Sequence, residues 1–301
     1  MKFEVVCAGL RFPEGPVWME DGSVIVVEIE AGRISRIQPD GTREIIATPG
    51  GGPNGAAIGP DGALYVCNSG GMACFEQDGL ILTHGQASAD YQTGSIDRVD
   101  LATGAATLLY DFADGRQLFS PNDIVFDRDG GMWFSDYGKQ IGNIYHGGGI
   151  FYARADGSHI RRVIEGLNNV NGIALSPDDR TLYVALTNER LVLAFDIEGP
   201  GRLSPPPGRV VTSFPGRQMI DSMAVTADGH ICVGTLWEVQ GVAQVDPATG
   251  RYSDIAFPDF YTTNICFGGP DMQDAWVTLS TTGRLVKVRW DRPGHRLAYY
   301  A

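Results

Sequence analysis

The chain has 301 residues, with 36 acidic and 23 basic side chains and a formal charge of −13. Its hydrophobic fraction of 43%, with 13 Phe, 11 Tyr and 5 Trp, excludes a largely disordered protein. The acidic balance, without any run of Lys or Arg, argues against a nucleic-acid backbone or an anionic membrane surface as partner. The start of the chain lacks the charged and apolar regions of a secretory signal, and no apolar run approaches the roughly 20 residues that span a bilayer. We therefore expect a cytoplasmic protein that is a monomer or a weak homo-oligomer.

The cysteines form neither a disulfide framework nor a zinc ribbon. They are odd in number, scattered and never spaced as CxxC. We expect reduced packing residues at all five positions: Cys7, Cys67, Cys74, Cys232 and Cys266.

Short strands joined by tight turns should dominate the fold, because the chain has 40 Gly, 17 Pro and almost no capped helical period. Six β-rich segments, most of them after an Asp-Gly or Asp-Asp turn, should be strands of one kind. In chain order they are Ser23–Glu28, Ala63–Cys67, Met132–Ser135, Thr181–Ala185, Ile231–Gly234 and Ala275–Leu279. A further strand, the third of each unit, should follow each of these segments. These strands are expected in Gly32–Ile37, Gly94–Val99, Gly149–Ala153, Leu191–Asp196, Gly241–Asp246 and Gly283–Val288.

A short polar motif, such as Pro53-Asn54-Gly55, stands before each of the six turns. Its central residue lies seven positions before the turn in every unit, and successive central residues are 40 to 68 positions apart. The central residues are Glu14, Asn54, Asn122, Asn171, Asp221 and Asn264. This period is typical of four-stranded propeller blades. We therefore predict an all-β protein, a six-bladed β-propeller with four-stranded blades around a central metal-binding channel, as one domain over residues 1–301.

The N-terminal strand near Phe3–Val6 should complete the last blade. The alternative fold, a β-sandwich with a second domain, would not explain six equal offsets. Two longer excursions, 70–93 and the shorter 137–149, should be loops, the first of them over one mouth of the channel.

The six central residues should form a ring, because the innermost strand of each propeller blade lines the axial channel. Two carboxylates and four carboxamides each offer a side-chain oxygen, which suits one divalent cation. Ca²⁺ or Mg²⁺ come first, with Mn²⁺ or Zn²⁺ as substitutes. Taken singly, these residues also suit ordinary turns. Glu14 and Asp221, however, are poor turn residues, and two carboxylates facing a narrow channel repel one another unless a cation or a proton lies between them.

The motifs together resemble the gluconolactonase and senescence marker protein (regucalcin-like) family of six-bladed propellers, which is related in architecture to diisopropyl fluorophosphatase. The resemblance runs essentially from end to end. The matching segments are Phe12–Trp18, Ser120–Asp123, Val170–Ala174, Ile220–Met223 and Thr262–Gly269.

This resemblance implies roles for individual residues. Glu14, Asn171 and Asp221 correspond to metal ligands, and Asp221 also corresponds to the catalytic base. Asn122 and Asp123 correspond to residues that border the substrate, and Asn122 would also contact the metal.

One departure concerns the substrate pocket. Ser120 stands where the sugar-binding members carry an arginine, which argues against a polyhydroxylated sugar lactone and is compatible with an aromatic or a deoxy lactone. Ser222 follows Asp221 where the family often has Gly, a change that leaves the carboxylate in place.

The function that the resemblance implies is metal-dependent hydrolysis of a small lactone, with Asp221 as general base toward water. The alternatives are a phosphotriesterase-like hydrolase, a non-catalytic calcium-binding propeller and a metal-free strictosidine-synthase-like propeller. The five histidines form no HExxH motif, and no GxSxG elbow occurs. Any local positive charge toward the substrate must come from residues such as Lys139 or Arg116.

Overall fold

The computed structural model describes residues 2–300, and every regular element in this range is a β-strand. The expectation of an all-β protein is thereby confirmed. No helix in this range has the length and apolar character needed to cross a membrane.

Six sheets within residues 2–300 share one plan, in which four strands pair antiparallel from one edge to the other. Sheet 1 contains β2 (Pro13–Trp18), β3 (Val24–Glu28), β4 (Arg33–Ile37) and β5 (Arg43–Ala47); sheet 2 contains β6 (Pro53–Ile58), β7 (Leu64–Asn68), β10 (Ser95–Val99) and β11 (Ala106–Tyr110); sheet 3 contains β14 (Pro121–Phe126), β15 (Gly131–Asp136), β18 (Gly149–Arg154) and β19 (Ile160–Glu165). Sheet 4 contains β20 (Val170–Leu175), β21 (Thr181–Leu186), β22 (Leu191–Gly199) and β24 (Arg209–Ser213), with the short β23 (Arg202–Leu203) on β22; sheet 5 contains β25 (Met219–Val225), β26 (Ile231–Leu236), β27 (Gly241–Val245) and β28 (Tyr252–Ala256); sheet 6 contains β29 (Thr262–Gly268), β30 (Asp274–Leu279), β31 (Arg284–Arg289) and β1 (Phe3–Ala8).

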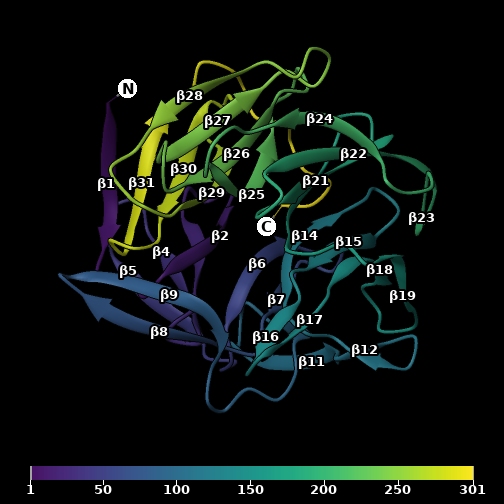
Figure 1. The fold of residues 1–301 in the computed structure, drawn as a ribbon. Coiled ribbons are helices and arrows are strands. Elements are labelled where there is room, and N and C mark those ends of the chain that lie inside the picture. Colours follow the sequence, from purple (N-terminus) through teal and green to yellow (C-terminus); the bar gives the residue numbers. More distant parts are fainter. Residues whose placement is uncertain (1, 301) are drawn as a thin grey trace.

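The predicted strands are confirmed, and so is the pairing of the two ends of the chain. β1 lies antiparallel to β31, with Phe3 opposite Val288, so the purple N-terminal strand runs beside the yellow C-terminal one in Figure 1. The second strand of each sheet is buried almost throughout, because it has sheets on both sides. Runs of Val, Ile and aromatic residues suit that position.

The turns between first and second strands follow the expected chemistry. In the first turn, the Asp21 carboxylate accepts a hydrogen bond from the Ser23 amide at 2.9 Å, which is the usual way for Asp to stabilise a turn. Gly22 follows with a φ of 88°, a backbone conformation that favours glycine. In sheets 4 and 6 the equivalent positions are Asp179 and Met272, which adopt φ values of 57° and 58°.

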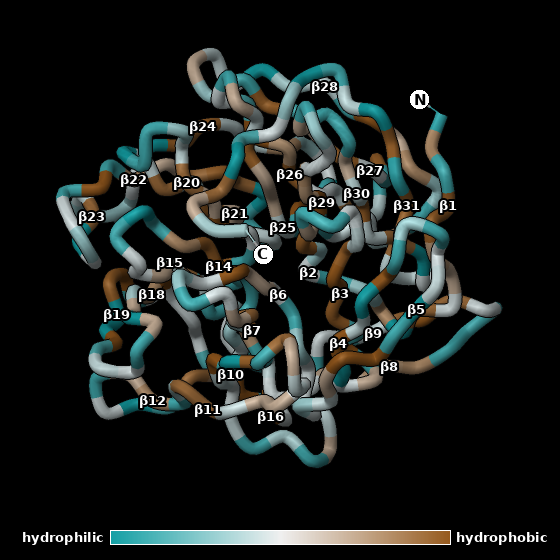
Figure 2. Tube along the Cα trace, turned by 180° about the vertical axis from the view of Figure 1, so that it is seen from behind, coloured by the Kyte–Doolittle hydropathy of each residue, from teal (hydrophilic) through white to brown (hydrophobic). Residues whose placement is uncertain are grey.

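The first strands of successive sheets lie against one another. β2 contacts β6, β6 contacts β14, and the series continues through β20, β25 and β29, which in turn contacts β2. Figure 1 shows the sheets arranged around a common centre. The hydrophobic core lies between neighbouring sheets; for example, Tyr65 and Cys67 of sheet 2 pack with Phe134 and Phe151 of sheet 3. Figure 2 shows apolar stretches along strands such as β3 and polar connections around them.

The prediction that the two excursions are loops is wrong. Both segments contain strands of their own. Segment 70–93 contains the hairpin β8 (Met72–Gln77) and β9 (Leu80–Ala87), and segment 137–149 contains β16 (Lys139–Ile141) and β17 (Ile144–His146). β16 pairs with β9, so the two excursions form one additional sheet. A further small hairpin joins β12 (Phe112–Ala113) to β13 (Arg116–Gln117). Backbone pairing across the excursions explains the difference, because it could not be read from either segment alone.

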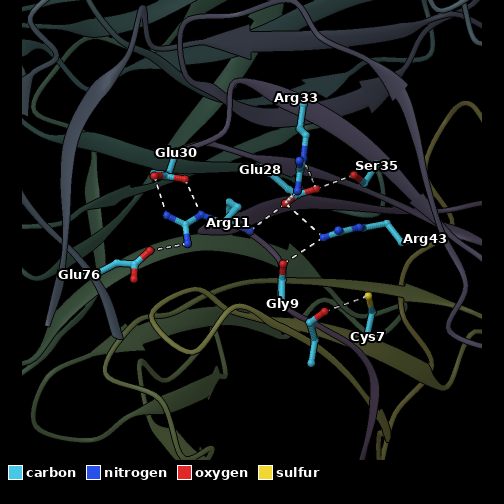
Figure 3. Close-up of polar contacts among 10 residues, drawn as sticks. Cys7, Gly9, Arg11, Glu28, Glu30, Arg33, Ser35, Arg43 and Glu76 are labelled. Carbon is cyan, nitrogen blue, oxygen red and sulfur yellow. Dashed lines mark hydrogen bonds and ion pairs between the residues drawn. The ribbon is translucent and has the colours of Figure 1, made fainter. Parts of the chain in front are cut away.

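The β8–β9 hairpin reaches over sheets 1 and 6. Arg11 joins Glu30 of sheet 1 to Glu76 of β8, each through a 2.6 Å ion pair (Figure 3). The Ile81 amide donates to the Thr281 carbonyl, 2.8 Å away, just beyond β30. The β8–β9 hairpin is thus held by contacts with sheets 1 and 6, in addition to its pairing with β16.

Candidate metal and substrate site

A cavity of about 350 Å³, here called the acidic cavity, lies where the first strands begin. Five of the six predicted ring residues line it: Glu14, Asn54, Asn122, Asn171 and Asp221. A smaller cavity of about 100 Å³, here called the tail cavity, is lined by the later residues of the same strands and by the C-terminal segment from His295 to Tyr300. The sixth ring residue, Asn264, lines the tail cavity.

A β-bulge lies at or beside the motif in every first strand of the six sheets of residues 2–300, for example between Glu14 and Val17. Bulges redirect side chains and are common beside active sites. In sheets 1, 2 and 4 the motif residue is followed by a glycine, which allows the first strands to approach one another closely. A Cβ at Gly15 would overlap the Asn54 carbonyl, and one at Gly172 would lie 2.7 Å from the Asp221 carbonyl. The local sequence thus places the motif side chains around a confined space.

Glu14 is 2% exposed, and one of its oxygens is held from two sides. Its Oε2 accepts hydrogen bonds from the Gly15 amide at 2.5 Å and from Asn264 Nδ2 at 2.7 Å. Burial raises the pKa of Glu14 to about 7, although these two donors act to lower it. Asn264 Oδ1 accepts a hydrogen bond from the Ile265 amide at 2.8 Å. It therefore positions Glu14 with its amide nitrogen, whereas we had expected its oxygen to face a cation.

Asp221 lies in the field of a second carboxylate. Burial raises the pKa of Asp221 well above its ordinary value, the charge of Glu14 raises it further, and a hydrogen bond with Asn171 lowers it. The groups that act most strongly on Glu14 and Asp221 include no Lys, Arg or His. Two carboxyl groups without a basic partner are unfavourable in a buried site unless a proton or a cation neutralises them.

The two asparagines of the predicted ligand set have oxygen atoms to spare. Asn122 Oδ1 is buried and has no hydrogen-bond partner. Asn171 donates its Nδ2 to Thr187 Oγ1 at 3.0 Å, and its Oδ1 has only a long contact of 3.4 Å with Ser222 Oγ. A buried carbonyl oxygen without a partner is costly. This donor set of two carboxylates and two carboxamide oxygens fits a hard divalent cation. Residues 2–300 hold no cluster of three or more His, Cys, Asp or Glu side chains suited to a metal, so a cation here would require the asparagines.

The three predicted substrate-binding residues do not all lie on the same cavity. Ser120 and Asn122 line the acidic cavity, whereas Asp123 lines the tail cavity. The Asp123 carboxylate accepts hydrogen bonds from the amides of Ile124 at 3.0 Å and Ile173 at 3.3 Å. Burial and then the charge of Glu14 raise the pKa of Asp123 to about 8. Both oxygens of Asp123 thus accept hydrogen bonds from backbone amides, one in sheet 3 and one in sheet 4.

Several cavity residues occupy equivalent positions that the sequence analysis did not connect with one another. Ile29, Ser69, Tyr137 and Thr187 each follow directly after the second strand of their sheet, and all four line the acidic cavity. Because the second strand runs antiparallel to the first, its end lies beside the start of the first strand. The predicted second strands could therefore have indicated these positions.

The two basic candidates, Lys139 and Arg116, lie at different places. Lys139 lines the acidic cavity, whereas Arg116 lies in a separate groove and pairs with Glu165 at 2.5 Å. His146 stacks on Phe119 with ring centroids 4.8 Å apart. All five cysteines are free, as predicted.

The chain is similar in sequence and in fold to known proteins. Residues 12–281 match the family model described as SMP-30/Gluconolactonase/LRE-like region. A gluconolactonase from Zymomonas mobilis is 28% identical over 203 residues, covering 60% of this chain and 51% of that protein. The lactonase drp35 from Staphylococcus saprophyticus is 29% identical over 233 residues, covering 76% of this chain and 65% of that protein. The chain thus spans between about half and two thirds of the length of these relatives.

Solved structures with the same fold extend over nearly the whole chain. A gluconolactonase structure from Xanthomonas campestris has a TM-score of 0.75 and 25% identity, covering 95% of this chain and 89% of that one. The regucalcin structure from Agrobacterium tumefaciens has a TM-score of 0.74 and 18% identity, covering 98% of both chains. Because the family model covers most of the chain, this protein belongs to the SMP-30/gluconolactonase/LRE-like family.

Proposed function

We propose that the chain is a metal-dependent hydrolase that opens the ring of a small lactone. The observation that carries this proposal is the pair of carboxyl groups, Glu14 and Asp221, that share the acidic cavity, with no Lys, Arg or His among the groups that act most strongly on either of them. The partnerless Asn122 Oδ1 adds a third oxygen donor to the same cavity. The relatives named gluconolactonase and lactonase support lactones as the substrate class.

The fold that goes with this proposal is a closed six-bladed β-propeller, formed as one domain over residues 1–301. Two observations support it: the first strands contact one another in an unbroken series that returns from β29 to β2, and six sheets repeat one strand order. In this arrangement the acidic cavity and the tail cavity are the two ends of one central channel. The protein would act as a monomer or weak homo-oligomer in the cytoplasm, on a small molecule rather than a nucleic acid or a membrane.

The cation would be held by Glu14, Asn171, Asp221 and Asn122. Ca²⁺ is the first candidate, because all four donors are oxygens and because the Agrobacterium regucalcin is described as a calcium-binding protein. Mg²⁺, Mn²⁺ and Zn²⁺ are the substitutes. A cation bound there polarises the lactone carbonyl and stabilises the oxyanion that forms on attack.

The side chains of this protein supply orientation and proton transfer. Asp221 accepts the proton of the attacking water on a carboxylate oxygen and returns it to the ring oxygen when the acyl C–O bond breaks. Ser120 and Asn122 border the substrate from the cavity wall. Asp123 contributes to substrate binding through Asn122, because its own carboxylate accepts hydrogen bonds from the backbone amides of Ile124 and Ile173. Since Ser120 offers no positive charge, we favour a deoxy or aromatic lactone over a sugar lactone.

The test is a pH-drop assay of lactone hydrolysis by protein stripped with EDTA, before and after addition of each of the four cations. The panel contains sugar, aliphatic and aromatic lactones, with a phosphotriester for comparison. We expect turnover of at least one lactone that is lost on stripping and restored by metal. Turnover of the phosphotriester alone, or lactone turnover that survives removal of the metal, would contradict the proposal.

A further inference from the structure

Lys139 is the most unusual basic residue of the molecule. It begins β16 and is only 4% exposed, yet it lines the acidic cavity. Its ammonium group donates to the Ser69 carbonyl at 3.0 Å and lies 5.1 Å from the centre of the Tyr91 ring. One of three N–H donors is therefore used by the backbone, and the aromatic ring accepts part of the remaining charge.

No carboxylate among residues 2–300 forms an ion pair with this ammonium group. Lys139 takes part in none of the ion pairs found among residues 2–300. The carboxylate that acts on it most strongly is Asp136. Both Asp136 oxygens are already held by backbone amides, those of Ser120 and Gly138 at one oxygen and that of Phe119 at the other, at 2.8 to 2.9 Å. An ammonium group buried without a carboxylate in direct contact is unfavourable, so its retention at a cavity wall points to a ligand that supplies a negative charge there.

A second polar group without a partner lies beside Lys139. The Ser69 hydroxyl is buried and has no hydrogen-bond partner, and Ser69 lines the same cavity. Its carbonyl is the group that holds the ammonium. An ammonium and a hydroxyl from adjacent positions can together donate to the two oxygens of one carboxylate.

The remaining cavity wall is apolar in part, and it also carries polar residues such as Thr83, His84 and Asn188. Phe12, Ile29, Met219 and Leu236 line the cavity from sheets 1 and 5. These apolar side chains favour a ligand whose remaining surface is hydrocarbon. A single ammonium also matches a singly charged group better than a phosphate dianion, because Glu14 and Asp221 add negative charge to the same cavity.

We infer that Lys139 determines specificity by selecting lactones that carry a carboxylate group on an otherwise apolar ring. This inference rests on the proposed lactonase function and names its substrate class. The cation site would engage the lactone carbonyl, and Lys139 with Ser69 would hold the carboxylate at the other side of the cavity.

The test compares three five-membered lactones in the metal-loaded protein: γ-butyrolactone, γ-carboxy-γ-butyrolactone and the methyl ester of the latter. The measurement is the ratio of kcat/KM for the carboxylate to kcat/KM for its ester, which have nearly the same shape and differ in charge. We expect the ratio in the wild-type protein to exceed about 10, and to fall about 10- to 100-fold in Lys139→Met. The change should appear mainly in KM. Lys139→Gln, which keeps a donor and loses the charge, should behave like the Met variant.

Lys287→Met is the matched control, because Lys287 pairs with Asp274 at 2.8 Å and does not line the acidic cavity. It should keep the wild-type ratio. An unaltered ratio in Lys139→Met would overturn the inference, as would a wild-type protein that hydrolyses the ester as fast as the carboxylate. The second result needs no variant, so it decides the question even where Lys139→Met fails to fold. Absence of turnover on all lactones with every cation would instead reject the proposed function.

Discussion

Two buried glutamates of sheet 1, Glu14 and Glu28, lie on neighbouring strands but in opposite electrostatic surroundings. Glu28 is fully buried, and its carboxylate pairs with Arg33 at 2.7 Å, accepts from Ser35 at 2.5 Å and lies 3.8 Å from Arg43 (Figure 3). Burial acts to raise the pKa of Glu28, but the hydrogen bonds from Arg33 and Ser35 outweigh it, and the pKa is lowered. For Glu14, burial dominates and raises the pKa to about 7.

The difference separates charges that belong to the fold from charges available to a ligand. The carboxylate of Glu28 has all the partners it needs within the protein, so it can remain ionised without anything being bound. Glu14 has amide donors but no cation, and it shares its cavity with Asp221. Replacement of Glu28 by a neutral residue should therefore lower the stability of the fold, whereas replacement of Glu14 should impair cation binding.

The largest effect is expected at Asp221. We expect Asp221→Asn to lower kcat for any lactone substrate by about 10²- to 10⁴-fold, because the amide cannot accept the proton of water. Steady-state kinetics with saturating metal measure this effect. Asp228→Asn, which changes an exposed carboxylate paired with Arg292, is the control and should retain its kcat. Full activity of Asp221→Asn would remove Asp221 from the mechanism.

The next effect concerns stability and tests the comparison directly. Glu28→Gln should lower the free energy of unfolding by about 3 kcal/mol, because it leaves Arg33 beside a neutral group in a buried network. Glu14→Gln in metal-free protein should change it by less than about 1 kcal/mol, since no cation loses its partner. Urea denaturation followed by tryptophan fluorescence measures both. With Ca²⁺ present, the wild-type protein should gain stability through binding and Glu14→Gln should not. Equal losses for the two variants without metal would show that the contrast between the glutamates is wrong.

The smallest effect is the pH dependence of the carboxylate preference. Burial lowers the pKa of Lys139 to about 8, with Asp136 and Cys74 acting in the opposite direction, while Tyr91, whose pKa burial raises to about 12, stays neutral. The ammonium group is thus charged below pH 7 and loses its proton as the pH rises through 8. The ratio of kcat/KM for the carboxylate lactone to that for its methyl ester should fall about tenfold between pH 7 and pH 9.

Using a ratio removes titrations that affect both substrates equally, such as those of the catalytic carboxyl groups. In Lys139→Met the ratio should be low and independent of pH over this range. A wild-type ratio that stays constant to pH 9 would mean that the ammonium is not what distinguishes the two lactones.

The sequence by itself determined the strands and the motif residues. Asp-Gly turns, short β-rich segments and a polar motif seven residues before each turn are local features, and a six-fold repeat of local features predicts six similar sheets. The positions of Glu14, Asn122, Asn171 and Asp221 on the acidic cavity follow from the same repeat. The resemblance to the family rests on these residues too, which is why it extends along most of the chain.

Only the tertiary structure decided where individual atoms point and which distant segments meet. Asn264 turns its amide nitrogen to Glu14, because its oxygen is taken by the Ile265 amide. Asp123 lines the tail cavity, although Asn122 beside it lines the acidic one, because the bulge in β14 lies where the first residues of the strand give way to the later ones. Lys139 reaches the acidic cavity and Arg116 does not. The position of Lys139 depends on the pairing of β16 with β9. This contact joins segments about 50 residues apart, and no local pattern encodes it.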